Sequence, residues 1–291
     1  KAGPGAFGSQ LGLKHWLKLN FPNKNVYAVG TQQPKEAFFD LMDEVSDDTI
    51  SKSLVVVVDT GTSSRIDDER FKLGKYIVKI DHHIETDPFG DLNIVEVECA
   101  ATCELLAKMF FEQTSYKMNK FIAETLYRGL LTDTLRFSTN NTTPNTLNIA
   151  SKLSEYEIDI SNLNRDMFNK ELSEFNFITK LRNKLIFSKN NKIGYVIYNI
   201  KDIEESGFTP HEIRGNVAQF GSINELEIWC IFTEKLINNE IYYDGSLRSK
   251  SVALNEIASK YNGGGHKNAC GVKDLDKNNL QNLINDLNEC L

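Results

Sequence analysis

The clearest chemical signal in the sequence is an acid followed by two adjacent histidines, Asp81-His82-His83, at the end of the β-type run Tyr76–Ile80. The chain holds only five histidines in 291 residues, so composition alone does not explain such a pair at a strand's end. In an open α/β sheet, ligands bind beyond the carboxyl ends of the strands. Imidazole and carboxylate groups together are ligands for Mn, Fe or Zn. The alternative is that Asp81 caps a turn and both histidines lie at the surface.

Two further acids stand where predicted elements end. Asp59 follows the run Leu54–Val58, and Asp133 follows a predicted helix near Met118–Leu131. Each has a structural explanation, because an Asp after a strand often caps the next helix. A two-metal site needs several carboxylates and histidines that converge from separate elements. Three such groups at the expected rim of one sheet therefore favour a metal site over three independent caps.

A glycine run near the end of the chain is the second signal. Gly263-Gly264-Gly265 leaves backbone N–H groups unobstructed, so that an anion can approach closely. A helix starting just beyond the run would add to phosphate binding. Upstream, Arg248 has a guanidinium group that can bind a phosphate through two parallel hydrogen bonds. The alternative is a flexible loop together with a surface arginine.

The elements that must position the acids form an α/β pattern. Leu54–Val58 is a continuous β-branched run, as expected of a strand buried on both faces of a parallel sheet. Val26–Val29 is predicted as a short strand before it, and Tyr76–Ile80 as the next strand along the chain. Alternating strands and helices imply right-handed βαβ units. Predicted helices in this part of the chain are residues 9–20, 34–45 and 67–74, followed by a mostly helical stretch from Cys99 to about Phe187.

A length of 291 residues favours two domains at about 100–200 residues each. The polar cluster at 188–192 marks the predicted linker, because the periodicity changes after it. We therefore predict an α/β domain over 1–187 with a parallel sheet, and a smaller α+β domain over 193–291. In the second domain, strands are predicted near Ile193–Ile200, Leu226–Phe232 and Glu240–Leu247, and helices at Pro210–Phe220, Val252–Lys260 and Lys277–Glu289.

The composition restricts the class of protein. A net charge of −7 argues against a protein that grips long duplexes electrostatically, although a small anion can still bind where cations and metals gather. No apolar run approaches the roughly 18 residues of a membrane span, and no secretion leader is recognised. Five cysteines without a CxxC pattern predict free thiols in a reducing cytosol. The expected location is therefore cytoplasmic.

In these motifs the chain resembles the DHH family of phosphoesterases with an attached DHHA1 domain. Asp81-His82-His83 matches the motif that names the family, Val57–Thr60 the preceding aspartate motif, and Gly129–Thr134 the later one. Gly245–Lys250 and Ile257–Gly271 resemble the substrate-binding signature of the DHHA1 domain. The resemblance covers nearly the whole chain, and the two-domain layout is most similar to the stand-alone nanoRNase and pAp-phosphatase group.

The resemblance implies a role for each residue of the first domain that matches. Asp59 would bridge two divalent ions, usually Mn²⁺, with Mg²⁺ or Co²⁺ as alternatives. His82 and Asp133 would complete one metal position. His83 would face the scissile phosphate, and Asp81 would orient the two histidines.

The resemblance also implies roles in substrate binding. The far end of the substrate would be held by Arg248, Ser249, Gly264, Gly265 and His266. Arg136, shortly after Asp133, is a weaker candidate for phosphate binding. A terminal nucleotide held at a fixed distance from the metals would select short substrates.

The first motif of the family, His-x-x-Pro-Asp-Gly-Asp-Ala-x-Gly-Ser, is only partly present. Pro4, Gly5, Ala6, Gly8 and Ser9 appear in order, whereas both aspartates and the histidine do not. Either residues are missing upstream, which we favour because the other motifs are intact, or the protein is a variant that cannot load both metals. The same stretch spells G-x-G-x-x-G, but it lacks the strand before it and the later acid that a dinucleotide site needs.

We therefore predict a phosphodiesterase that trims short oligoribonucleotides to mononucleotides, with removal of the 3′-phosphate of pAp as a further activity. The expected partners are short single-stranded RNA or DNA oligonucleotides or nucleotide phosphates, and a homodimer is left open. Hydrolysis of cyclic dinucleotides or of linear dinucleotides such as pApA and pGpG is the second hypothesis. A non-catalytic nucleotide-binding protein is the alternative from another class, should the first motif be truly absent.

Overall fold

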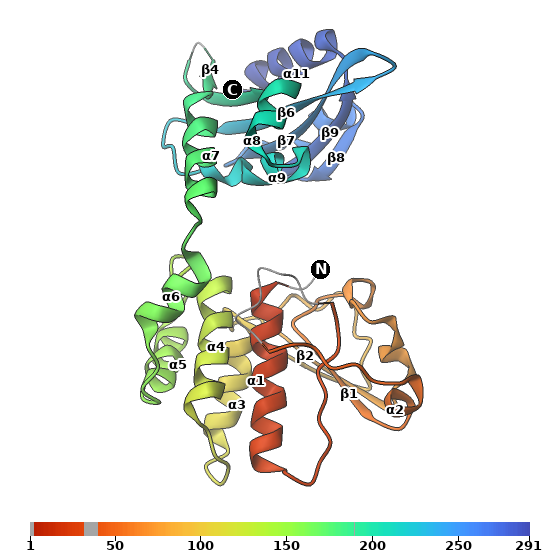
Figure 1. Ribbon diagram of the computed structural model, residues 1–291, viewed down its shortest axis with the longest axis vertical. Helices are drawn as coiled ribbons and strands as arrows, with labels where there is room; N and C mark the ends of the chain where they lie inside the picture. The colour runs from red at the N-terminus through yellow and green to blue at the C-terminus, as the bar shows by residue number, and fades with distance from the viewer. Residues whose placement is uncertain (1–2, 32–39, 189) are drawn as a thin grey trace. The chain divides into compact units, whose positions relative to one another are not determined.

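The computed structural model describes residues 3–31, 40–188 and 190–291 (Figure 1). The chain divides into two compact units, Lys1–Asn169 and Lys170–Leu291. This division comes earlier than the linker predicted at 188–192. Helix α7 (Leu172–Asn183) explains the difference, because its buried side chains pack in the core of the second unit.

The described residues of the first unit form a sheet of three parallel strands in the order β1-β2-β3. They are β1 (Leu54–Val58), β2 (Tyr76–Asp81) and β3 (Leu92–Val95), of which β3 was not predicted. Val58 pairs with Ile80 at the carboxyl edge of the sheet. Because β1 and β2 run in the same direction, Asp59 and Asp81 leave the sheet side by side.

Helices pack on this sheet and against one another (Figure 1). Gly8 and Gly129 allow two of them, α1 and α4, to approach closely, since a Cβ at Gly8 would lie 2.9 Å from the Gly129 Cα. Leu106, Leu126 and Leu130 belong to the shared core. The helices are α1 (Pro4–Asn20), α2 (Asp47–Ser51), α3 (Thr102–Glu112), α4 (Lys120–Asp133), α5 (Pro144–Ser154) and α6 (Ile160–Phe168), with 3-10 helices at Ser63–Arg65 and Glu69–Leu73.

Two predictions about the start of this sheet are wrong. Val26–Val29 forms no strand, and Leu54–Val58 is not buried on both faces, since Val57 alone of its five residues is buried. The reason is that β1 pairs with β2 alone among the described strands, and a cavity of about 830 Å³ runs along its other side. Most of the helix predicted at 34–45 lies outside the described residues, and 40–45 are not helical.

The second unit contains a six-stranded mixed sheet in the order β4-β5-β6-β7-β9-β8. Among the strands that the structure describes in this sheet, only β5 and β6 are parallel neighbours. The strands are β4 (Ile186–Phe187), β5 (Ile193–Tyr198), β6 (Ile228–Ile237), β7 (Glu240–Ser249), β8 (Gly263–His266) and β9 (Ala269–Leu275). Besides α7, the helices are α8 (Ile200–Ser206), α9 (Pro210–Gly215), α10 (Asn255–Ser259) and α11 (Lys277–Glu289), with a 3-10 helix at Asn216–Phe220.

The glycine run differs from its prediction. It forms the edge strand β8, which pairs with β9 in antiparallel fashion, and no helix begins directly after it. Gly265 has φ +142°, and a Cβ there would lie 2.4 Å from the Ala269 carbonyl oxygen. Only glycine fits this close strand pairing, so the run has a structural reason besides any role in binding an anion.

All five cysteines lie in the described part of the chain and are free thiols. Four are buried, and Cys290 is exposed. In the same described residues, no helix is long and apolar enough to cross a membrane.

Candidate metal centre and active site

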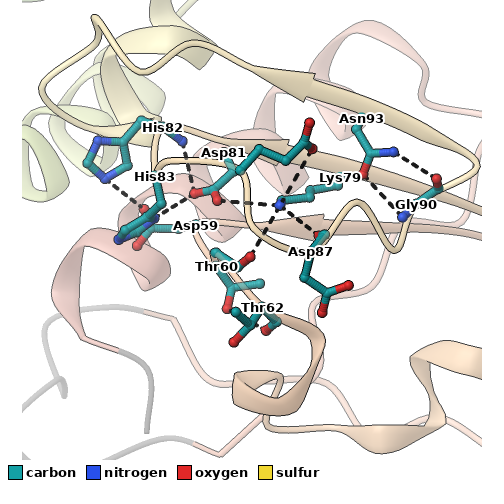
Figure 2. Close-up of polar contacts among 12 residues, drawn as sticks. Asp59, Thr60, Thr62, Lys79, Asp81, His82, His83, Asp87, Gly90 and Asn93 are labelled. Atoms are coloured by element: carbon teal, nitrogen blue, oxygen red, sulfur yellow. Dashed lines mark hydrogen bonds and ion pairs between the residues drawn. The ribbon is translucent and has the colours of Figure 1, made fainter.

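Asp59, His82 and His83 form a cluster at the carboxyl edge of the first sheet. One side-chain donor atom from each of them lies within 4.8 Å of the others, and His82 Nε2 is 3.6 Å from Asp59 Oδ1. Asp59 directly follows β1, and the two histidines directly follow β2 (Figure 2). Carboxylate oxygen and imidazole nitrogen gathered in this way are donors suited to a divalent transition metal.

Asp81 orients the two histidines through hydrogen bonds to both of them. Its side chain is fully buried, and Oδ1 accepts hydrogen bonds from His83 Nδ1 at 2.7 Å and from the His82 backbone N–H at 2.9 Å. Burial alone would raise the pKa of Asp81, but these hydrogen bonds and the charge of His83 hold it below its ordinary value. The same hydrogen bond raises the pKa of His83, which opposes the effect of burial. Asp81 is therefore the anionic partner of His83.

The His82 ring is fixed by the backbone before helix α3. Its Nδ1 donates to the Cys99 carbonyl oxygen at 3.1 Å, which leaves Nε2 on the side of Asp59. A metal-binding histidine usually donates its other ring N–H to a carbonyl or carboxylate in this way. Thr102 at the start of α3 donates its hydroxyl to Asp59 Oδ1 at 2.8 Å. The segment 99–102 therefore orients both His82 and Asp59.

The last residue of α4, Asp133, supplies a carboxylate near this cluster, but it is not one of the three residues whose donor atoms lie within 4.8 Å of one another. Burial, followed by the negative charge of Asp59, raises the pKa of Asp133 to about 7. Its Oδ2 atom is buried and has no hydrogen-bond partner among the described residues. Gly5 of α1 packs against it so closely that a Cβ there would lie 2.4 Å from Asp133 Oδ1.

These side chains fit a divalent cation. A buried carboxylate oxygen without a partner is costly, because it loses its hydration without gaining a hydrogen bond. A carboxylate whose pKa is raised by burial and by a neighbouring negative charge is stabilised when a cation neutralises it. Asp133 has these properties beside Asp59, and the oriented imidazole of His82 completes a donor set of the usual kind.

Left-handed backbone conformations occur next to the candidate ligands. Asp59 has φ +59°, and three consecutive residues after Asp133 are left-handed, Leu135 at +44°, Arg136 at +61° and Phe137 at +62°. Such conformations cost non-glycine residues energy and often occur at functional sites. Thr134 stabilises the turn, since its buried hydroxyl donates to the Leu130 carbonyl and accepts from the Phe137 N–H.

Arg136, predicted as a weaker phosphate-binding candidate, stacks on an aromatic ring. Its guanidinium carbon lies 4.8 Å from the centre of the Phe168 ring. The side chain remains exposed, but it does not line the cavity that opens beside Asp59 and His83.

The predicted substrate-binding residues of the second unit lie on β7 and β8, two strands that are separated by β9 in the sheet. Arg248 is half-buried on β7, where its Nη1 donates to the Leu247 carbonyl oxygen at 2.8 Å. On β8 the predicted residues Gly264, Gly265 and His266 are exposed. Ser249 is different, because its hydroxyl donates to the Val252 carbonyl at 2.6 Å and accepts from Asn268 at 2.9 Å. The Ser249 hydroxyl therefore holds the following loop.

Three residues near the centre were missed by the sequence analysis. Thr102 binds Asp59, Lys79 is buried beneath the Asp-His-His motif, and Arg65 lines the same cavity as Asp59 and His83. A detectable signal existed only for Lys79, because a lysine inside the otherwise apolar run Tyr76–Ile80 is unusual. Thr102 and Arg65 occupy positions where such residues are common.

Comparison with known proteins places these observations in a family. The chain matches the DHH family, N-terminal domain, over residues 5–130 and the DHHA1 domain over residues 192–291. It is 34% identical over 290 residues to the bifunctional oligoribonuclease and PAP phosphatase NrnA of Bacillus subtilis, covering 98% of this chain and 90% of the relative. It is also 34% identical to a probable NrnA of Streptococcus mutans, covering 100% of this chain and 92% of that protein.

The fold is shared with a solved structure. An exopolyphosphatase-related protein from Bacteroides fragilis matches with a TM-score of 0.76 and 22% identity, covering 99% of this chain and 88% of the other. At that identity the likeness concerns the fold alone. It agrees with the two-domain architecture predicted from the sequence.

Proposed function

The chain belongs to the DHH family of phosphoesterases, with a DHHA1 domain in its second unit, and from that membership we propose that it hydrolyses short oligoribonucleotides to mononucleotides. The observation that carries the proposal is the cluster of Asp59, His82 and His83 at the carboxyl edge of the sheet. The NrnA relatives that match almost the whole chain are named as oligoribonucleases and as PAP phosphatases. We therefore include the 3′-phosphate of pAp as a second substrate.

We propose that Asp59, His82 and Asp133 hold a divalent metal, with manganese as the expectation. When bound, such a metal lowers the pKa of a water molecule and neutralises charge on the phosphate oxygens. The chain's own residues prepare this arrangement. Cys99 fixes the His82 ring through Nδ1, and Thr102 fixes the Asp59 carboxylate.

His83 has a separate role in the proposal. Its Nδ1 is held by Asp81, and its side chain is 43% exposed, so Nε2 is free to contact a phosphate oxygen. The raised pKa of His83 favours the protonated ring, which donates a hydrogen bond to that oxygen. Asp81 remains ionised beneath it and stabilises the positive charge.

We further propose that the second unit binds the substrate away from the scissile phosphate. Arg248 provides a guanidinium group, and the exposed strand containing Gly264 and Gly265 offers backbone close to solvent. His266 at the end of that strand is exposed as well. Binding at one end of a nucleotide, without a long basic surface, suits a chain with a net charge of −7.

The test is Mn²⁺-dependent hydrolysis of a substrate panel: a dinucleotide, a five-mer, a long RNA, pAp and a cyclic dinucleotide. Fast turnover of the two short linear RNAs, with little on the long RNA, supports the proposal. Preference for the cyclic dinucleotide points to the second hypothesis, and binding without turnover points to a nucleotide-binding protein.

A pair of histidine variants serves as the control for the site assignment. His82→Ala is expected to abolish turnover while the fold is retained. His211→Ala removes an exposed histidine of the second unit and should leave turnover unchanged. Wild-type activity in His82→Ala would exclude the assigned metal centre.

A further inference from the structure

We propose that Lys79 is a positioning residue of the metal centre. Its buried ammonium group joins the loop after Asp59, the loop after His83 and the Asp81 carboxylate between them. The proposal rests on the proposed function, in which these groups hold the metal and contact the phosphate. It assigns a role to a residue that does not itself reach the substrate.

The burial of Lys79 is the first observation. The residue lies inside strand β2 and its side chain is 0% exposed. Burying an ammonium group costs several kcal/mol unless it is paired and hydrogen-bonded. Side chains two residues apart on a strand share a face, so Lys79 and Asp81 lie on the same face of the sheet. The surroundings of Lys79 must therefore supply compensating acceptors.

Those acceptors come from both loops that flank the centre. Lys79 Nζ donates to the Asp87 carbonyl oxygen at 3.1 Å (Figure 2). It also donates to the Gly61 carbonyl oxygen at 3.4 Å. Gly61 follows Asp59 by two residues, and Asp87 follows His83 by four. One ammonium group thus connects the segments that carry Asp59 and His83.

The same group also provides the charge opposite Asp81. Lys79 Nζ is 3.9 Å from Asp81 Oδ2, a buried oxygen without a hydrogen-bond partner among the described residues. The other oxygen of Asp81 is the one that binds His82 and His83. The ammonium group therefore faces one side of this carboxylate while the other side orients the histidines.

Two neighbouring contacts complete the enclosure of the ammonium group. Glu85 Oε1 lies 3.8 Å from Lys79 Nζ, and the centre of the Phe89 ring lies 5.2 Å away.

A pair of hydrogen bonds joins the same two loops independently of Lys79. The Asp87 carboxylate accepts from the Ser63 backbone N–H at 2.8 Å and from its hydroxyl at 2.6 Å. The loops can thus remain associated when the ammonium group is removed. Loss of Lys79 is therefore expected to shift the ligands more than to unfold the unit.

The test compares Lys79→Met, which removes the charge and leaves an unbranched side chain one atom shorter, with Lys52→Met, a matched control on a side chain that is 72% exposed. Mn²⁺ affinity is measured first by calorimetry without substrate, and kcat and KM for a dinucleotide are measured next. Loss of a residue that orients metal ligands typically costs about 10–100-fold in metal affinity or activity. We expect a loss of this size in Mn²⁺ affinity and in kcat for Lys79→Met, with KM within about twofold of wild type by the same reasoning.

A folded Lys79→Met with the Mn²⁺ affinity and kcat of the control would overturn the proposal. If Lys79→Met does not fold, Lys79→Arg decides, since its larger planar group keeps the charge but cannot reproduce the same two hydrogen bonds. Weakened Mn²⁺ binding in a folded Lys79→Arg supports positioning, and wild-type binding contradicts it. Absence of hydrolysis by the wild type would refute the proposed function alone, because the Mn²⁺ affinities still test Lys79. A wild type that binds no Mn²⁺ would refute both.

Discussion

Gly5→Ala tests whether the start of α1 controls the geometry of the metal centre. A Cβ at Gly5 would lie 2.4 Å from Asp133 Oδ1, 2.5 Å from Oδ2 and 2.7 Å from Cγ, all closer than real Cβ contacts. Either the Asp133 carboxylate rotates away or α1 moves. Both responses displace the carboxylate that we assign to the metal.

The size of the effect follows from these distances. Overpacking a buried position costs typically about 1–3 kcal/mol. For a unit of this size each kcal/mol lowers Tm by roughly 2–4 °C, so a fall of several degrees is expected. A displaced ligand should weaken Mn²⁺ binding by more than tenfold, because 1.4 kcal/mol already corresponds to about a factor of ten.

Gly3→Ala is the matched control. It adds the same methyl group two residues earlier, where no atom lies within 4 Å and where φ is −99°. Differential scanning calorimetry and Mn²⁺ titration of both variants separate stability from metal binding. If Gly5→Ala binds Mn²⁺ as tightly as Gly3→Ala does, the assignment of Asp133 to the metal centre is wrong.

Three further predictions concern strain, charge and substrate. Leu135→Gly should raise the free energy of unfolding by about 1 kcal/mol, because glycine adopts φ +44° without penalty and the leucine side chain is 61% exposed. A lower urea midpoint of unfolding than that of the wild type would contradict the strain argument. The pKa of Asp133 is raised from 3.8 to about 7. In metal-free protein this group should therefore lower the free energy of unfolding as the pH rises from about 4 to 7, by up to roughly 4 kcal/mol for three pKa units. Asp133→Asn should flatten that part of the stability profile, and an unchanged profile would exclude the shift. Arg248→Ala should raise KM for a dinucleotide about tenfold or more with little change in kcat, as expected when a charge-assisted contact to the substrate is lost. An unchanged KM would exclude Arg248 from the binding site.

The convergence of Asp59 and the two histidines was accessible from the sequence because a parallel sheet imposes it. Consecutive parallel strands end at the same edge, so the residue after β1 and those after β2 must be neighbours. Lys79 was not identified, since a strand pattern does not tell which carbonyl groups will surround a buried ammonium group.

The errors have equally local causes. The strand β8 consists of three glycines and a histidine, and without side chains there is no alternation to indicate a strand. Val26–Val29 has the composition of a strand, but a strand also needs a neighbouring backbone. The sequence did not indicate that α7 packs in the core of the second unit, because helical periodicity says nothing about which core its apolar side packs on.

The distribution of the thiols makes the chain suitable for timing the unfolding of each unit. Cys99 and Cys103 are buried in the core of the first unit, and Cys230 and Cys270 in that of the second. Burial raises the pKa of Cys99 to about 12 and raises those of the other three as well, so all four should be unreactive in the native state. Cys290, in contrast, is exposed at the end of α11. An alkylating reagent should therefore label Cys290 at once, and the later modification of each buried pair should report the opening rate of the unit that contains it.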